Sequence, residues 1–101
     1  MILINTTYCV APADGHLFLQ WAPAEYRAAV EKAGGADLLL LRVPSPDPSV
    51  ATFAVQFKVG SPEEAARWEA ESLPELIAGA LSGFGLGGDR LLHFTTMMDI
   101  L

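Results

Sequence analysis

The order of strand-like and helix-like segments along the chain is the feature that most limits its fold. Residues 2–10, 37–43, 50–59 and 90–100 are short and rich in β-branched, aromatic or other apolar residues, as strands are. Longer segments with helical spacing separate the first strand from the second and the third from the fourth. Right-handed crossovers and short connections leave one common solution for this order. We therefore expect an α+β, ferredoxin-like β-α-β-β-α-β fold, with a four-stranded antiparallel sheet ordered 4-1-3-2 and two helices on one face.

Residues that cap or break helices predict the limits of the first helix. Asp14 is expected to cap the helix that begins at the next residue, because its carboxylate can accept from free N–H groups of the first turn. Gly34-Gly35 is expected to end it, since glycine takes the left-handed conformation without strain. Pro23 lies inside this helix and predicts a kink or a short break near Trp21–Ala22.

The second helix has a stronger start signal. Ser61 and Glu64 form a capping box around Pro62, the first helical residue. Pro74 predicts a kink or the start of a second helical segment. The glycine-rich stretch "GLGG" neither follows a strand nor opens a helix, so it lacks the context of a phosphate loop and is expected to be a flexible connection.

Size and charge exclude several classes of protein. A chain of 101 residues predicts a single domain, 1–101. The net charge of −6 argues against nucleic acid and anionic membranes as partners, because both attract basic surfaces. The hydrophobic fraction of 51% is high for a small monomer and indicates a surface buried against a partner.

The N-terminal residues and the cysteine count point to the cytoplasm. The start "MILINTTYCV" has no basic region of a signal peptide, and no apolar run approaches the length of a membrane span. Cys9 is the only cysteine, so no internal disulfide is possible. His16 near Asp14 provides too few ligands for a metal, so no metal site and no cofactor are predicted.

A Thr-Thr pair occurs in both terminal strands, which are antiparallel neighbours in the expected fold. Aligning the two pairs is the simplest guess at the register. The facing residues would then be Thr7/Thr95, Thr6/Thr96, Asn5/Met97 and Cys9/His93. Facing residues point to the same side of a sheet, so this register decides which side chains share a surface.

This register predicts one face covered by the helices and one open face. The covered face would take Ile2, Ile4, Thr6, Tyr8, Val10, Phe53, Val55, Phe57, Phe94, Thr96, Met98 and Ile100. The open face would take Leu3, Asn5, Thr7, Cys9, Thr52, Ala54, Gln56, Lys58, His93, Thr95, Met97 and Asp99. Because several of the open-face residues are apolar, we expect a second copy to cover them in a homodimer.

The candidate ligand site lies on that predicted open face. Its residues are Asn5, Thr7, Cys9, Gln56, His93 and Thr95, which could offer donors and acceptors to a small apolar or carboxylate ligand between two sheets. The alternative is a polar, wet dimer interface without a ligand. Cys9 and His93 could form a thiolate–imidazole pair, or be a small apolar thiol and a hydrogen-bonded histidine. Trp21 and Trp68 fit helical stripes and are expected in the core.

The two ends of the chain resemble an uncharacterised family of short bacterial domains. That family opens with Met-Ile-x-Asn-Thr-Thr-aromatic and closes with Phe-x-Thr before an apolar, acidic tail. The matching residues here are Met1, Ile2, Asn5, Thr6, Thr7, Tyr8, Phe94 and Thr96. The resemblance spans nearly the whole chain and implies no activity; the inserted "GLGG" departs from the pattern.

The expected fold is also similar to that of the dimeric α/β-barrel proteins, which include cofactor-free monooxygenases, small isomerases and haem-degrading enzymes. The haem-degrading group uses Asn, Trp and His, types that Asn5, Trp68 and His93 supply, although a histidine on the last strand departs from that group's helical histidine. We therefore expect a homodimeric binding or interaction module with a polar open sheet face. The alternative is a cofactor-independent monooxygenase or isomerase that acts on a small ligand in a pocket between the sheets.

Overall fold

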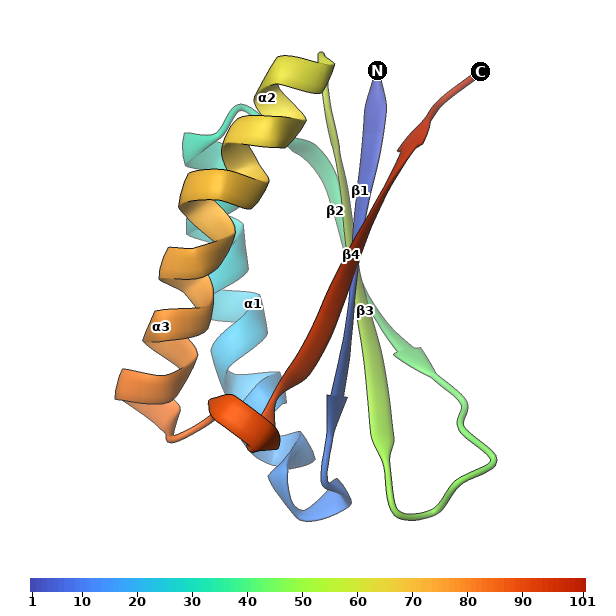
Figure 1. The fold of residues 1–101 in the computed structure, drawn as a ribbon, viewed down its shortest axis with the longest axis vertical. Helices are drawn as coiled ribbons and strands as arrows, with labels where there is room; N and C mark the ends of the chain where they lie inside the picture. The colour runs from blue at the N-terminus through green and yellow to red at the C-terminus, as the bar shows by residue number, and fades with distance from the viewer.

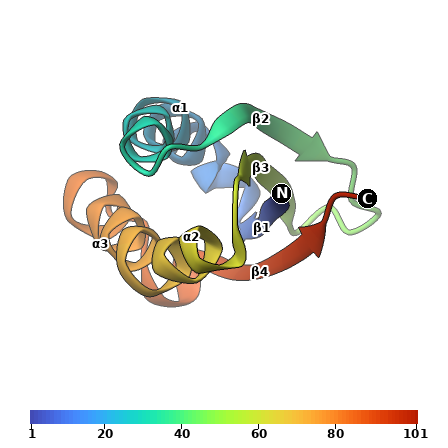
Figure 2. The same cartoon turned by 90° about the horizontal axis from the view of Figure 1, so that it is seen from above.

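The computed structural model describes residues 1–101 as a sheet with helices on one side (Figure 1). The strands are β1 (Ile2–Val10), β2 (Ala36–Val43), β3 (Ala51–Val59) and β4 (Leu92–Asp99). They form one antiparallel sheet in the order β2-β3-β1-β4. The helices α1 (Gly15–Lys32), α2 (Pro62–Arg67) and α3 (Leu73–Phe84) leave the other face of the sheet open (Figure 2). The predicted ferredoxin-like fold and its strand order are confirmed.

The core lies between the helices and the sheet and is rich in aromatic side chains. Every second residue of β1 is buried, from Ile2 to Val10, so one side of this central strand faces the helices. Trp21 of α1 and Trp68 after α2 are both almost fully buried, as predicted. Phe18 stacks on Phe53 with ring centroids 4.4 Å apart, which joins α1 to β3.

The start of α2 and the new helical segment at Pro74 follow the predicted signals, but α1 departs from them. The Ser61 hydroxyl accepts from the Glu64 N–H (3.2 Å), and the Glu64 carboxylate accepts from the Gly60 N–H (3.2 Å). A π-helical turn, Trp68–Ser72, joins α2 to α3, so Pro74 stands in the first turn of a new segment, as expected. The predicted break at Pro23 is wrong, because α1 is continuous. The proline removes one backbone hydrogen bond, but the packing of buried residues on both sides of it keeps the helix continuous.

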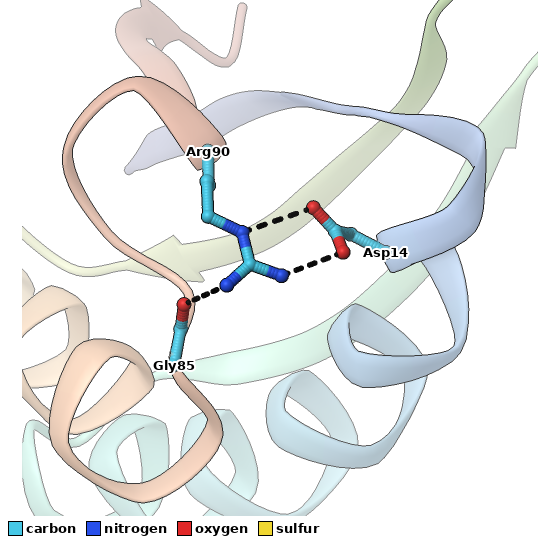
Figure 3. A network of polar contacts seen from close by, with 3 residues as sticks. All are labelled: Asp14, Gly85 and Arg90. Carbon is cyan, nitrogen blue, oxygen red and sulfur yellow. Dashed lines mark hydrogen bonds and ion pairs between the residues drawn. The ribbon is translucent and has the colours of Figure 1, made fainter.

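The linker from α3 to β4, expected as a flexible connection, is held by a buried side chain and by several hydrogen bonds. Gly85 ends α3 in the left-handed conformation (φ 70°), and the next side chain, Leu86, is fully buried. Arg90 donates two hydrogen bonds to the Asp14 carboxylate, at 2.7 and 3.3 Å, and one to the Gly85 carbonyl at 2.9 Å (Figure 3). Asp14 therefore binds Arg90 and does not cap α1 with its side chain.

The register of β4 differs by one residue from the predicted one. Thr6 pairs with Thr95 and Tyr8 with His93, so the predicted pairs Thr7/Thr95, Thr6/Thr96, Asn5/Met97 and Cys9/His93 are wrong. A shift of one residue moves every side chain of a strand to the other face. The helix side of β4 therefore carries His93, Thr95, Met97 and Asp99, and the open side carries Leu92, Phe94, Thr96 and Met98. Apolar residues occupy both sets, so alternation along β4 did not distinguish the two registers.

Candidate functional site

The open face of the sheet has a polar centre. Asn5, Thr7, Cys9 and Gln56 lie on it as predicted. The Gln56 amide donates to Asn5 Oδ1 (3.0 Å), and the Asn5 amide donates to the Thr7 hydroxyl (3.2 Å). Cys9 lies 3.9 Å from the Thr52 hydroxyl, S to O. These groups bond to one another across two central strands, and no large cavity opens among them.

Apolar side chains flank this polar centre on both outer strands. They are Leu39, Leu41 and Val43 from β2, and Leu92, Phe94 and Met98 from β4, each exposed over 39–60% of its surface. The face is thus more apolar than predicted, because the corrected register exchanges His93 and Thr95 for Leu92 and Phe94. Lys58 is its charged residue, and it pairs with Asp37 at 3.2 Å near one end of the sheet. An apolar surface of this extent is typical of an interface.

His93 and Thr95 lie on the helix side, away from the other predicted site residues. Thr95 and the buried Thr6 share a hydrogen bond of 2.9 Å between their hydroxyls. The His93 ring lies 6.0 Å from the Tyr8 ring, centroid to centroid. The predicted constellation is therefore split by the sheet, and no thiolate–imidazole pair forms, because Cys9 and His93 point to opposite faces.

A groove of about 650 Å³ runs between α3 and the edge strand β4, beside His93 and Thr95. Its lining residues are Glu69, Leu73, Pro74, Ile77, Ala78, Leu81, Gly87, Gly88, His93, Phe94 and Thr95. Leu73, Ile77 and Leu81 recur every four residues on one face of α3 and form an apolar wall. Gly87 closes one end, where a Cβ would stand 2.7 Å from the Leu81 side chain. In the sequence these three residues have the spacing of a core-facing helical stripe, so the pattern does not reveal the groove.

A buried hydroxyl pair lies in the core. The Tyr8 and Tyr26 hydroxyls are hydrogen-bonded to each other under the helices. Burial raises the pKa of Tyr26 to about 12 and raises that of Tyr8 further, so both phenols stay protonated near neutral pH. They serve as fixed hydrogen-bonding groups of the core and not as bases. The indole N–H groups of Trp21 and Trp68 have no hydrogen-bond partner.

A second groove, of about 670 Å³, lies between α1 and the α2–α3 pair and differs in character. Its charged lining residues are Glu25, Glu64, Glu71, Glu75, Lys32 and Arg67. Such mixed charges are typical of a solvated helix surface. No three His, Cys, Asp or Glu residues are grouped as a metal site, and no helix is both long and apolar enough to cross a membrane.

Three solved structures illustrate how widely this fold occurs. A putative antibiotic biosynthesis monooxygenase from Nitrosomonas europaea has a TM-score of 0.65 and 11% identity, with 98% of each chain covered. A dimeric ferredoxin-like protein from an uncultured marine organism has a TM-score of 0.60 and 14% identity, again over 98% of each chain. The de novo designed protein Foldit4 has a TM-score of 0.59 and 8% identity, over 99% of this chain and 98% of that one. A fold shared with a designed protein does not by itself imply an activity.

Comparison of the sequence with known families gives a more specific result. No curated protein is significantly similar to the chain. The model of the family described as a domain of unknown function, DUF4286, matches residues 1–101. This match agrees with the resemblance to an uncharacterised family seen in the terminal strands. The chain therefore belongs to the DUF4286 family of domains of unknown function.

Proposed function

We propose that the protein is a homodimeric binding module in which two copies pack through their open sheet faces. The observation that carries this proposal is the pair of apolar outer strands on a face that no helix covers. Leu41 on β2 and Phe94 on β4 represent the two sides. Exposed leucine, valine, phenylalanine and methionine on both flanks of the same face are costly in water and favour burial against a partner.

A second copy of this chain is the occupant that best fits the face. The face is nearly free of net charge, since Lys58 is neutralised by Asp37. Pairing it with itself around a two-fold axis therefore opposes no unpaired like charges. Strands of about eight residues, about 3.3 Å each, in four rows about 4.8 Å apart cover roughly 500 Å² in projection before side-chain relief is counted. That approaches the ~800 Å² per partner of a stable interface. One of the fold relatives is described as a dimeric ferredoxin-like protein, which supports a homodimer.

Sedimentation equilibrium tests the dimer. The wild type is expected at twice the chain mass of 10.8 kDa. Leu41→Glu places a carboxylate in the proposed interface and should yield a monomer, because a buried unpaired charge is strongly unfavourable. Leu19→Glu is the matched control, since Leu19 is similarly exposed (46% against 40%) but lies on α1. A monomeric wild type, or equal effects of the two substitutions, would contradict the proposed dimer.

A second function, a cofactor-independent monooxygenase or isomerase, is favoured by the place of His93 in the groove. An imidazole beside an apolar groove could take a proton from a bound small molecule. The fold relative named as a putative antibiotic biosynthesis monooxygenase supports an oxygenase. The pocket would then lie between α3 and β4, not between two sheets. Oxygen uptake with a panel of phenols and quinols should be abolished by His93→Ala and unaffected by His16→Ala. No uptake, or equal activity of the two variants, would contradict an oxygenase using His93.

A further inference from the structure

The groove between α3 and β4 has a composition that restricts what it could hold. We propose that it binds an uncharged, apolar molecule that carries one hydrogen-bonding group, and that His93 and Thr95 contact that group. This inference deepens the binding role proposed above by naming a ligand class. It does not require the dimer, because every lining residue comes from one chain.

The size and walls of the groove fit a small molecule. Its volume of about 650 Å³ lies within the ~300–1,000 Å³ typical of ligand pockets. One wall is the row formed by Leu73, Ile77 and Leu81, and the edge strand β4 forms the other. Removing this apolar surface from water provides the driving force for binding. A molecule that binds here must therefore be mainly apolar.

The charges around the groove disfavour an anion. No lysine or arginine lines it, and its carboxylate, Glu69, is exposed on the π-helical turn at the rim. The whole chain carries a net charge of −6. An anion that entered the groove would lose its hydration and find no cationic side chain there. It would also be repelled by the negative charge of the protein, so both effects weaken its binding. These charges exclude the carboxylate ligands considered from the sequence and favour a neutral molecule.

The polar groups of the groove lie together on β4. The Thr95 hydroxyl shares a hydrogen bond of 2.9 Å with the hydroxyl of the buried Thr6. A hydroxyl has one donor and two acceptor positions, so Thr95 keeps hydrogen-bonding capacity for a ligand. His93, two residues earlier on the same side of the strand, is exposed and adds a second polar contact. Two neighbouring polar side chains in an otherwise apolar groove can orient one polar group of a ligand.

Two fluorescent probes that differ by one charge test this proposal. N-phenyl-naphthylamine is neutral, and anilinonaphthalene sulfonate has the same rings with a sulfonate added. We expect saturable binding of the neutral probe, with one site per chain, and binding of the sulfonate at least about tenfold weaker, as one unfavourable charge interaction can produce. Equal or tighter binding of the sulfonate would overturn the assignment.

Charge reversal tests the role of Glu69. Glu69→Lys places a cation at the rim of the groove and should strengthen sulfonate binding about tenfold. Glu71→Lys is the matched control, because it makes the same change in net charge on the same π-helical turn but faces the other groove. A similar gain in both variants would show that overall charge, not the groove, governs binding, and would contradict the proposal.

Filling the groove separates this site from the open sheet face. Ala78 is exposed and lines the groove, so Ala78→Trp should abolish binding of the neutral probe without disturbing the core. Ala70→Trp, an equal change on an exposed residue that lines neither groove, should leave binding unaltered. If Ala78→Trp still binds the probe, the ligand site lies elsewhere. Repeating the titration with Leu41→Glu distinguishes failure of the dimer from failure of the groove, since the monomer should still bind.

Discussion

Replacing Thr95 by valine tests the register that divides the site residues between the two faces. Valine has nearly the shape of threonine, so the substitution removes a hydroxyl without leaving a cavity. In the observed register, Thr95 is the hydrogen-bond partner of Thr6, which is 1% exposed. The change therefore leaves the buried Thr6 hydroxyl without this hydrogen-bond partner. Thr96→Val is the matched control on the adjacent residue, because Thr96 is exposed, points to the open face and makes no side-chain hydrogen bond.

The size of the effect follows from the burial of Thr6. A buried polar group that loses its partner costs about 1–3 kcal/mol, whereas replacing both partners by apolar groups of the same shape can be nearly neutral. Tyr26 lies near enough for Thr6 to affect the pKa of its phenol, so it can compensate in part. We expect Thr95→Val to lower the free energy of unfolding by about 1–2 kcal/mol. Thr96→Val should change it by less than about 0.5 kcal/mol, and adding Thr6→Val to Thr95→Val should recover part of the loss.

Urea unfolding at one fixed protein concentration measures these differences, since stability of a dimer depends on concentration. The double-mutant cycle of Thr6 and Thr95 should give a coupling energy clearly different from zero, and the cycle of Thr6 and Thr96 should give none. The opposite pattern, with coupling to Thr96, would restore the register first predicted from the sequence. It would return His93 to the open face and refute the account of the groove.

Three further predictions concern stability. Gly35→Ala should lower stability by about 1–3 kcal/mol, because the added Cβ would stand 2.8 Å from the buried side chains of Phe57 and Val30. Gly79→Ala should raise stability by about 0.5–1 kcal/mol, because no atom lies within 4 Å of the added Cβ. Thermal unfolding of the two variants measures both changes. Hydrogen bonds from Arg90 lower the pKa of Asp14, so its contribution is present above the ordinary value of 3.8 and is lost as the pH falls through the lowered one. The difference in Tm between wild type and Asp14→Asn should therefore vanish in acid, and a difference that persists at low pH would contradict this. Burial raises the pKa of Tyr26 from 10 to about 12, so stability should fall as the pH rises above 10, and Tyr26→Phe should flatten that decline in urea midpoints.

The fold could be predicted because its signals are local. Alternation along β3, the Ser61 cap and the glycines after α1 each define an element without reference to the rest of the chain. The strand order then follows from the element order and the handedness of crossovers. Pro74 marked a new helical segment, but Pro23 did not break α1, since the tertiary packing of its neighbours outweighs one lost hydrogen bond.

The site was harder to predict because it depends on contacts between distant residues. β4 carries apolar residues on both sides, so the Thr-Thr pairs were the available guide to its register, and an error of one residue moved His93 and Thr95 across the sheet. The pairing of Arg90 with Asp14 joins residues 76 positions apart and has no pattern in the sequence. The groove forms only where α3 passes the edge strand, and the stripe Leu73, Ile77, Leu81 appears identical to a core stripe until that geometry is known.

Measuring which protons of two copies approach each other is the most direct test of whether the chain dimerises through its open sheet face. An isotope-filtered NOESY experiment on an equal mixture of labelled and unlabelled chains detects only protons that approach each other across an interface. We predict intermolecular signals from the methyl groups of Leu41, Leu92 and Met98, and none from Leu19 on α1. Intermolecular signals confined to the helices, or none at all at a concentration where the mass is that of a single chain, would contradict the proposed dimer.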